Sequence, residues 1–468
     1  MSFLGNNTFA LLARGGRFGY FTGDNGQMIR IEPIIQGGPA SGGMGNFDVI
    51  VIGGGAAGMF SSAIAAGRGA RVLLLERNDR LGKKLSITGK GRCNLTNDCT
   101  VGQVIENIPN DGRFLYSSLS GFTPGDTMEM FRSLGLPLKK ERGGRVFPSS
   151  DKATDVVEAL RRHTIESGVT IRRCRVSGLI AEDGYITGVS APDLRIGCNA
   201  VILATGGMSY PATGSSGDGY VMAGSLGHTV TPLRGSLVPL VAEPETCAKM
   251  QGLSLRNVSV RVYDGSGRPI FSDFGELLFT HFGLSGPLAL SASAHMRDFE
   301  NKKYTVSVDL KPALDEKKLD QRIIRDFEKY SNRDFQNSLG DLLARLMIPV
   351  VIDRSGIPPD IKTHSVSREQ RRRLVTVLKD FHIVVDGLRP VEEAIITSGG
   401  LALSQINPKT MESKLISGLF FAGEIIDADA YTGGYNLQIA WSTAYAAGNA
   451  AGNAAARRVE RNRQTYGT

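Results

Sequence analysis

The residues of this 468-residue chain with the clearest chemical meaning are three glycines in the pattern Gly53-x-Gly55-x-x-Gly58. Because glycine lacks a β-carbon, a turn built from it can approach a pyrophosphate closely, and a helix that follows offers N–H donors and partial positive charge. Eighteen residues after Gly58, Glu76 ends an apolar run, where its carboxylate can accept hydrogen bonds from ribose hydroxyls. The spacing predicts a dinucleotide site. The charge of Glu76 would repel a 2′-phosphate, which argues against NADP(H) there.

A second glycine-containing turn lies far along the chain. An apolar run ends at Ala422-Gly423-Glu424, Asp427 follows, and Gly433-Gly434-Tyr435-Asn436 opens a helix. The N-terminus of that helix could stabilise negative charge on a reduced isoalloxazine ring, which favours FAD over NAD. Ala204-Thr205-Gly206-Gly207 would end another strand beside the same cofactor. The alternative is an ordinary packed strand and helix.

A basic loop begins seven residues after Glu76. It runs from Lys83 to Asn94 with the sequence KKLSITGKGRCN, and its lysines and arginine are placed to meet phosphates or the flavin. It is not a P-loop, because that motif requires glycine where Lys84 stands and serine or threonine where Gly91 stands.

Two residues of the chain are candidates for proton transfer. Cys93 lies between Arg92 and Asn94, and basic neighbours lower the pKa of a thiol, so Cys93 could donate or accept a proton near flavin N5. An inert packed thiol is the alternative. His281, within the segment FTHFGLSG (279–286), is a second acid candidate, and a purely structural histidine is the alternative there. We predict catalytic roles for both.

The chain contains no second G-x-G-x-x-G after a predicted strand. A dedicated nicotinamide domain is therefore not expected. We predict FAD as the bound cofactor and NAD(P)H as a transient reductant that reaches the flavin by another route.

The elements that must position these residues begin with a βαβ unit. Phe47–Ile52 is a β-branched run that ends at glycines, an Ala-rich helix extends to Gly67, and a second apolar run covers 71–75. The pattern predicts two parallel strands. Short alternating strands follow at 169–180, 186–190 and 194–196, and they predict a β-meander that closes on a buried strand at 200–206.

The middle of the chain differs in character. Strand-like runs at 258–263 and 304–310 precede charged, helical segments at 315–329 and 369–380, which indicates an inserted domain. The apolar run 419–423 and an Ala-rich helix from Gly434 to about Arg461 then return to the cofactor domain. The cofactor domain is therefore predicted to be discontinuous. The expected divisions are a flexible N-terminal extension (1–45), the first segment of the FAD-binding domain (46–235), an inserted β-barrel followed by a helical region (236–392), the second segment of the FAD-binding domain (393–458) and a tail (459–468).

Charge and cysteine content narrow the class of partner. The chain has 54 Lys and Arg against 46 Asp and Glu, a net charge of +8, which permits a polyanionic partner or simply well-solvated faces. Its five cysteines form no C-x-x-C pair, so we expect neither a disulfide framework nor a metal site, and a cytoplasmic setting. The uncharged run 49–67 is interrupted by glycines 53–55, so a membrane span is not predicted.

From about Phe47 to Arg457 the chain resembles the BaiN/RdsA family of NAD(P)/FAD-dependent oxidoreductases. The N-terminal extension falls outside this resemblance. The residues that carry it are 53–58, Gly89-Lys-Gly-Arg-Cys-Asn94, Ala204-Thr-Gly-Gly-Met-Ser-Tyr-Pro211, Thr213-Gly-Ser-Ser-Gly-Asp-Gly219, Phe279-Thr-His-Phe-Gly-Leu-Ser-Gly-Pro287, Thr397-Ser-Gly-Gly400, and Gly423-Glu424 through Gly433-Gly-Tyr-Asn-Leu-Gln438.

The resemblance implies an α/β fold: a Rossmann-type FAD-binding domain of the glutathione-reductase-like class, interrupted by an inserted β-barrel and a small helical domain. It also implies that FAD lies across both glycine turns and the basic loop. The predicted cofactor-binding residues are Gly53, Gly54, Gly55, Ala56, Ala57, Gly58, Glu76, Arg77, Lys84, Arg92, Cys93, Asn94, Val176, Thr205, Gly206, Gly423, Glu424, Asp427, Gly434, Tyr435, Asn436 and Gln438.

The activity that the resemblance implies is reduction of a carbon–carbon double bond. Family members reduce uracil to dihydrouridine in large-subunit ribosomal RNA or enones in bile-acid intermediates. An RNA substrate needs phosphate contacts from Lys and Arg, whereas a steroid needs an apolar slot, so the basic charge favours RNA. The alternatives are a small-enone reductase, an amino-compound oxidase, and an RNA-binding protein in which FAD is structural.

Overall fold

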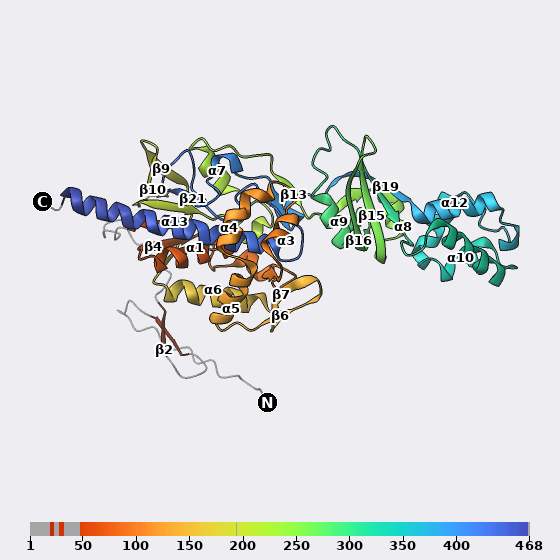
Figure 1. Ribbon diagram of the computed structural model, residues 1–468, viewed down its shortest axis with the longest axis horizontal. Coiled ribbons are helices and arrows are strands. Elements are labelled where there is room, and N and C mark those ends of the chain that lie inside the picture. The colour runs from red at the N-terminus through yellow and green to blue at the C-terminus, as the bar shows by residue number, and fades with distance from the viewer. Residues whose placement is uncertain (1–18, 23–27, 32–46, 193, 467–468) are drawn as a thin grey trace, which may run out of the picture.

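The computed structural model describes residues 19–22, 28–31, 47–192 and 194–466, and it describes side chains for 47–192 and 194–454. A large α/β region, a β-barrel and a group of helices follow one another along the longest axis (Figure 1). Two separate clusters of buried apolar side chains stabilise them: one lies in the α/β region, and the barrel and the helices share the other.

The centre of the α/β region is a five-stranded parallel sheet in the order β21-β12-β3-β4-β8. Its strands are β3 (Val49–Ile52), β4 (Val72–Glu76), β8 (Thr170–Arg173), β12 (Ala200–Leu203) and β21 (Leu419–Phe421). Every residue of β3 and β12 is buried, which explains why these strands read as continuous apolar runs rather than alternating ones.

Two helices from opposite ends of the chain pack together beside this sheet. Helix α1 (Ala56–Gly67) contacts α13 (Tyr435–Tyr466), and α13 also contacts β12 and β21. Helix α6 (Ala153–Glu166) contacts α1 from another side. The final helix therefore returns to the first βαβ unit, as Figure 1 shows with α13 alongside α1.

The segment between β4 and α6 forms a small lobe. It contains α2 (Lys83–Ile87), α3 (Val101–Glu106), α4 (Tyr116–Gly121), α5 (Pro124–Ser133) and a three-stranded sheet of β5 (Thr96–Asn97), β7 (Arg145–Pro148) and β6 (Leu138–Lys140). Strand β5 contacts α13, so the lobe lies against the start of the last helix.

The expected strand at 169–180 is wrong as a single element. Its first half is β8, which pairs in parallel with β4, and its second half is β9 (Gly178–Glu182), which pairs with β10 (Tyr185–Ala191). Strand β11 (Leu194–Gly197) completes this meander. The break arises because the two halves hydrogen-bond to different sheets, a choice that local alternation does not encode.

The insert is a closed six-stranded barrel in the order β14-β17-β16-β15-β18-β19, with helices attached. Its strands are β14 (Leu240–Ala242), β15 (Ser254–Asp264), β16 (Pro269–Thr280), β17 (Gly283–Ser285), β18 (Tyr304–Asp309) and β19 (Phe381–Leu388). Helix α9 (Gly286–Ser293) packs on β16. Helices α10 (Glu316–Lys329), α11 (Ile348–Ser355) and α12 (Arg368–Lys379) lie between β18 and β19 in the chain.

The strands that lead into and out of the insert pair with each other. β13 (Arg234–Ser236) is antiparallel to β20 (Ile396–Ser398). The predicted fold class, a Rossmann-type FAD-binding domain interrupted by a β-barrel and a small helical region, is confirmed.

Most of the predicted 1–45 extension lies outside the described residues. Within it, β1 (Gly19–Thr22) and β2 (Met28–Ile31) pair as antiparallel strands. At the other end, α13 continues to Tyr466, so the predicted 459–468 tail is helical as far as that residue.

Candidate functional site

A hollow of about 950 Å³ lies at the carboxyl ends of the parallel strands. Residues that follow β3, β4, β8, β12 and β21 all line it, and the insert supplies a further wall. In open parallel sheets this edge is where ligands bind, because strand ends and helix starts converge there. The wall from the insert and its connecting strands consists of Leu237, Leu278, Ser285, Gly286, Pro287, Leu290, Ile395 and Ile396.

The fingerprint turn forms the floor of the hollow next to α1. Gly53 has φ +103°, and a β-carbon at Gly58 would meet the Gly53 carbonyl oxygen at 1.7 Å, so both glycines are required by the backbone itself. Gly55 is different, because nothing lies within 4 Å of the position its β-carbon would occupy. This space lies in front of the uncapped N-terminus of α1, where a pyrophosphate would accept backbone N–H bonds.

Glu76 lies at the end of β4 with 8% of its surface exposed. One carboxylate oxygen accepts a hydrogen bond from the Gly54 N–H at 2.6 Å, and the other accepts one from the Asn78 N–H at 2.7 Å. Each oxygen retains a second lone pair, and the side chain lines the hollow. The carboxylate is therefore oriented by the protein and can accept hydrogen bonds from the hydroxyls of a ribose.

Two polar atoms along the hollow lack partners among the described residues. Asn94 Oδ1 and Thr205 Oγ1 are buried, and neither forms a hydrogen bond. Both residues line the hollow. Because unpaired buried polar atoms cost free energy, such atoms beside a hollow indicate the place of a ligand with hydrogen-bonding groups. Together with the open turn at Gly55 and the oriented Glu76 carboxylate, they fit FAD.

Lys84 is held by a carboxylate rather than left free for a phosphate. Its Nζ donates to Glu424 Oε2 and to Ser209 Oγ, each at 2.6 Å. The other Glu424 oxygen accepts a hydrogen bond from the Thr397 N–H at 2.9 Å. This ion pair joins the basic loop to the strand end at β21 and contributes to the wall of the hollow.

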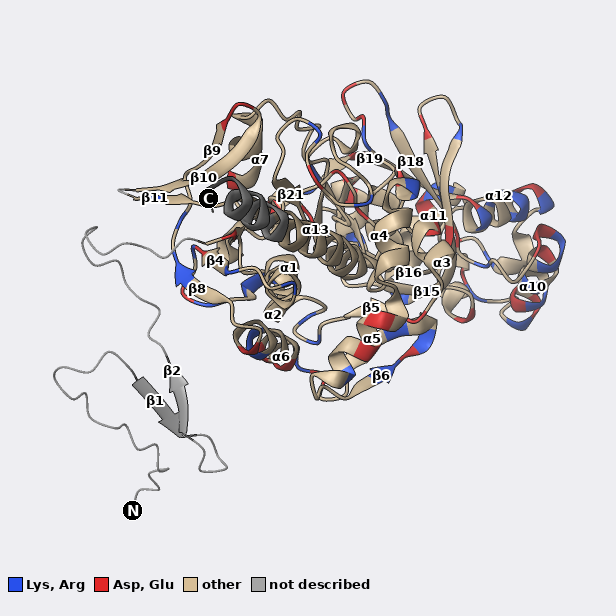
Figure 2. Ribbon diagram, turned by 60° about the vertical axis from the view of Figure 1, so that its left-hand side comes forward, with Lys and Arg blue, Asp and Glu red and all other residues tan. Residues whose placement is uncertain are grey.

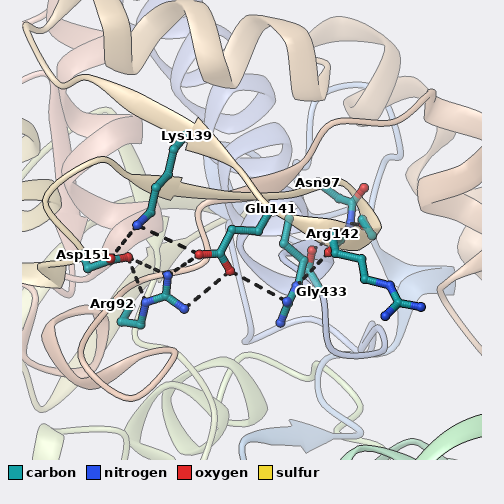
Figure 3. Close-up of polar contacts among 9 residues, drawn as sticks. Arg92, Asn97, Lys139, Glu141, Arg142, Asp151 and Gly433 are labelled. Carbon is teal, nitrogen blue, oxygen red and sulfur yellow. Dashed lines mark hydrogen bonds and ion pairs between the residues drawn. The ribbon is translucent and has the colours of Figure 1, made fainter. Parts of the chain in front are cut away.

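Arg92 is likewise neutralised by acidic partners (Figure 3). It donates to Glu141 at 2.5 Å and to Asp151 at 2.6 Å, and its guanidinium stacks on the Phe147 ring at 4.2 Å. Lys139 binds the other oxygen of Asp151. The Arg92 guanidinium holds the pKa of the Glu141 carboxyl below its usual value. Arg92 therefore rigidifies the edge of the hollow.

Asn97 ties this lobe to the second glycine turn. Its Nδ2 donates to the Gly143 carbonyl at 2.9 Å and to the Gly433 carbonyl at 3.1 Å. Asn97 and Gly433 lie near each other in Figure 3. Gly434, with φ +99°, packs directly on the backbone of Thr96. The start of α13 is thereby fixed against β5 and lines the hollow.

Neither residue predicted to be catalytic lines the hollow. Cys93 has no exposed surface, and burial raises the pKa of its thiol, which is opposite to the direction expected from its basic neighbours. The positive charge of Arg92 is already paired with Glu141 and Asp151. It therefore does not offset the effect of burial on the pKa of the Cys93 thiol. His281 is exposed in the turn between β16 and β17, where its ring contacts Phe282.

The predicted cofactor-binding residues fall into two groups. Some turn away from the hollow: Gln438 has no exposed surface and bonds to Thr96 and Thr127, and Asp427 accepts a hydrogen bond from Thr231. Gly58, Cys93, Tyr435, Gln438 and Asp427 are outside its lining. Those that line it are Gly53, Gly54, Gly55, Ala56, Ala57, Glu76, Arg77, Lys84, Arg92, Asn94, Val176, Thr205, Gly206, Gly423, Glu424, Gly434 and Asn436.

The sequence alone did not indicate several residues of the hollow. Tyr431 precedes the second glycine turn by two residues, and its phenol oxygen lies 2.5 Å from Nε2 of His295 in the insert. Arg145 and Phe147 come from β7. Proximity to the glycines was the available signal for Tyr431, whereas nothing local marks His295, which is 136 residues away in sequence.

The fold and this hollow define a Rossmann-type, FAD-dependent oxidoreductase. The model of the HI0933-like protein Rossmann domain matches residues 47–450, and the chain belongs to this family. No helix in the described portion of the chain is long and apolar enough to cross a membrane.

Two curated relatives are similar over most of their length. The chain is 33% identical over 410 residues to the 3-dehydro-bile acid delta(4,6)-reductase of Clostridium scindens, covering 85% of this chain and 97% of the relative. It is 32% identical over 406 residues to the ribosomal RNA dihydrouridine synthase of Escherichia coli, covering 86% and 97%. Among solved structures, a flavocytochrome c3 fumarate reductase aligns with TM-score 0.46 and 20% identity, covering 90% of this chain and 79% of the other.

Proposed function

We propose that this enzyme uses NAD(P)H to reduce a carbon–carbon double bond conjugated to a carbonyl group, and that its substrate is uridine in large-subunit ribosomal RNA. We also place the enzyme in the cytoplasm. The observation that carries the proposal is the lining of the hollow, in which the residues that fit FAD are joined by a wall that the insert supplies. Two relatives with such substrates support it.

Different residues along the hollow bind the cofactor and enclose the substrate. The turn at Gly55 and the α1 N-terminus bind the pyrophosphate, and Glu76 orients the ribose. FAD held there would, once reduced by NAD(P)H, supply a hydride to the double bond. The insert wall, with Leu278, Pro287 and Leu290, excludes water from the acceptor.

Exposed basic side chains at the edge of the hollow favour RNA. Lys90 and Arg145 line it and are exposed, and Arg142, three residues before Arg145, is exposed as well. Among the described residues, Lys90 and Arg142 form no ion pair, and Arg145 lies 3.7 Å from Glu141. Exposed cations of this kind can contact phosphates. On α10 and α12, by contrast, both signs of charge are interspersed (Figure 2), and Arg371 pairs with Asp320.

A small enone is the second candidate, and the apolar portion of the wall favours it. Leu237, Leu278, Leu290 and Ile395 offer the slot that a steroid requires.

The deciding experiment compares the two substrates with one purified holoprotein. After reduction by NADPH or NADH, it is offered ribosomal RNA from a strain that lacks the gene, and separately a steroid dienone. We expect dihydrouridine by nucleoside mass spectrometry. Reduction of the dienone alone would favour the small-enone function, and bleaching by amines would indicate an amine oxidase. A flavin that NAD(P)H does not bleach, with RNA left unmodified, would indicate structural FAD.

A further inference from the structure

A tyrosine and a histidine from the two main regions of the molecule meet at the hollow. Tyr431 comes from the segment between β21 and α13 and lines the hollow, and His295 follows α9 of the insert. Their Oη and Nε2 atoms are 2.5 Å apart, with ring centroids 5.7 Å apart. Tyr431 therefore holds an ionisable hydroxyl at the place where the insert closes over the FAD-binding domain.

The surroundings hold Tyr431 in place. Its backbone N–H donates to the Asn107 carbonyl at 2.9 Å, and the Asn436 side chain exchanges two hydrogen bonds with Ala430. Close by in the chain, Asp429 is 2% exposed and accepts hydrogen bonds from Ser236 at 2.6 Å and Arg297 at 3.4 Å. A side chain fixed by both regions of the molecule is suited to position a proton.

The electrostatics leave the proton on the phenol in the resting state. Burial, with the negative charges of Asp273 and Asp429, raises the pKa of Tyr431. Burial and the positive charge of Arg297 lower the pKa of His295, so its imidazole is neutral. A neutral imidazole with its proton on Nε2 donates to Tyr431 Oη, and the phenol hydrogen is then free to point into the hollow.

The other protic groups are less suited to this role. Cys93 and His281 do not line the hollow, and Glu424 is bound by Lys84. Tyr210 also lines the hollow, but near Glu76. The Thr213 carbonyl, three residues after Tyr210, accepts a hydrogen bond from Asn78, which follows Glu76 by two residues.

We propose that Tyr431 is the catalytic proton donor and that His295 is its positioning residue, an inference that rests on the proposed function. The acceptor carbon β to the carbonyl gains a hydride from reduced flavin, which forms one C–H bond with two electrons. The π bond breaks, and its electron pair takes the phenol proton at the α carbon. The Nε2–H of His295 stabilises the resulting phenolate, which solvent then reprotonates. Uracil and enones share this chemistry.

The two half-reactions, reduction of the flavin by NAD(P)H and its reoxidation by the substrate, are measured separately in Tyr431→Phe. Tyr185→Phe is the control, because Tyr185 is an exposed tyrosine of the meander. We expect Tyr431→Phe to retain its flavin content, melting temperature and bleaching by NAD(P)H. Reoxidation of the reduced flavin by ribosomal RNA or the dienone should slow by about 100-fold or more. The control should match the wild-type protein.

The positioning role of His295 has its own readout, which does not depend on turnover. The holoprotein in its resting state is labelled with carbon-13 at the carbon that bears the tyrosine hydroxyl, and its NMR spectrum is recorded. The resonance that is missing from the spectrum of Tyr431→Phe belongs to Tyr431. His295→Ala should shift that resonance and raise its titration midpoint, and His295→Gln, which retains a donor near Nε2, should restore both.

The results separate a failure of the proton-donor role from a failure of the proposed function. Wild-type protein that reduces neither substrate refutes the proposed function, and the proton-donor role falls with it. Wild-type turnover together with an undiminished Tyr431→Phe rate overturns the role of Tyr431 alone. A Tyr431 resonance whose position and titration midpoint are unchanged in His295→Ala overturns the pairing of Tyr431 with His295.

Discussion

At the scale of single residues, the glycines of the fingerprint motif are required for different physical reasons. Gly58 and Gly53 are required by backbone contact and by a positive φ angle, whereas Gly55 faces open space at the start of α1. The same motif therefore combines a folding constraint with a binding constraint, and substitutions separate the two.

We expect Gly55→Leu to fold but to be purified without colour, because its side chain fills the pyrophosphate position. Flavin content and the melting temperature of the apoprotein measure this. Gly58→Ala serves as the contrast: its β-carbon meets the Gly53 carbonyl, so stability should fall by roughly 2 kcal/mol or more. A Gly55→Leu protein with normal flavin content would refute the fingerprint assignment.

Cys93 should behave as a packed thiol. Because burial raises its pKa, the reactive thiolate is scarcer than in an unfolded chain at every pH, and alkylation should remain slow as the pH rises from about 7 to 9. Mass spectrometry after iodoacetamide treatment should find Cys93 labelled only in denaturant. The partly exposed Cys99 provides an internal comparison. Cys93→Ala should keep its turnover, and loss of substrate reduction with intact bleaching would restore a catalytic role.

At the scale of elements, the basic loop and the β6–β7 hairpin meet at one edge of the hollow. Acidic partners bind Arg92 and Lys139 closely, whereas Lys90 and Arg142 are exposed, and Arg145 is exposed with a 3.7 Å contact to Glu141. Neighbouring cations in this edge thus have different roles: the paired ones stabilise the lobe, and the exposed ones can contact a ligand.

Replacing Lys90 and Arg145 with alanine should weaken binding of ribosomal RNA by about tenfold at moderate salt and reduce the slope of log affinity against log salt by about two. Reduction of the steroid dienone should remain at the wild-type rate, because no phosphate is involved. Filter binding across a salt series provides the measurement. Lys317→Ala with Lys318→Ala, on α10 of the insert, is the matched control. Equal losses in both double variants would contradict a specific RNA edge.

At the scale of the whole molecule, the hollow is shared by two regions with separate apolar cores. The β13–β20 pair, the ion pair of Arg297 with Asp429 and the contact of His295 with Tyr431 connect them. The insert is therefore docked by polar contacts as well as by the apolar wall of the hollow.

Arg297→Met should destabilise this junction. Asp429 is 2% exposed and would retain only its Ser236 partner, so we expect a loss of about 2 kcal/mol, moderated because Arg297 itself is 31% exposed. Denaturant unfolding measures it. The exposed pair of Arg256 and Glu276 is the control, and Arg256→Met should change stability by less than about 0.5 kcal/mol. Equal effects would show that the Arg297 pair does not hold the junction.

Much of the FAD-binding domain follows from local sequence. Buried parallel strands are continuous apolar runs, and the fingerprint turn needs glycine at particular positions, so β3, α1, β4 and Glu76 could be located without tertiary information. The same holds for α10 and α12, whose charged, periodic segments predicted helices to within a residue at each end.

Long-range contacts decided the rest. Whether Lys84 meets a phosphate depends on Glu424, which is 340 residues away, and the pKa of Cys93 depends on burial rather than on its neighbours in sequence. The pairing of Tyr431 with His295 exists only once the barrel has docked. The sequence by itself determined the dinucleotide turn and its cofactor class, because backbone sterics and apolar patterning are local. Only the tertiary structure decided which side chains reach the hollow, because burial and charge pairing arise from segments far apart in the chain.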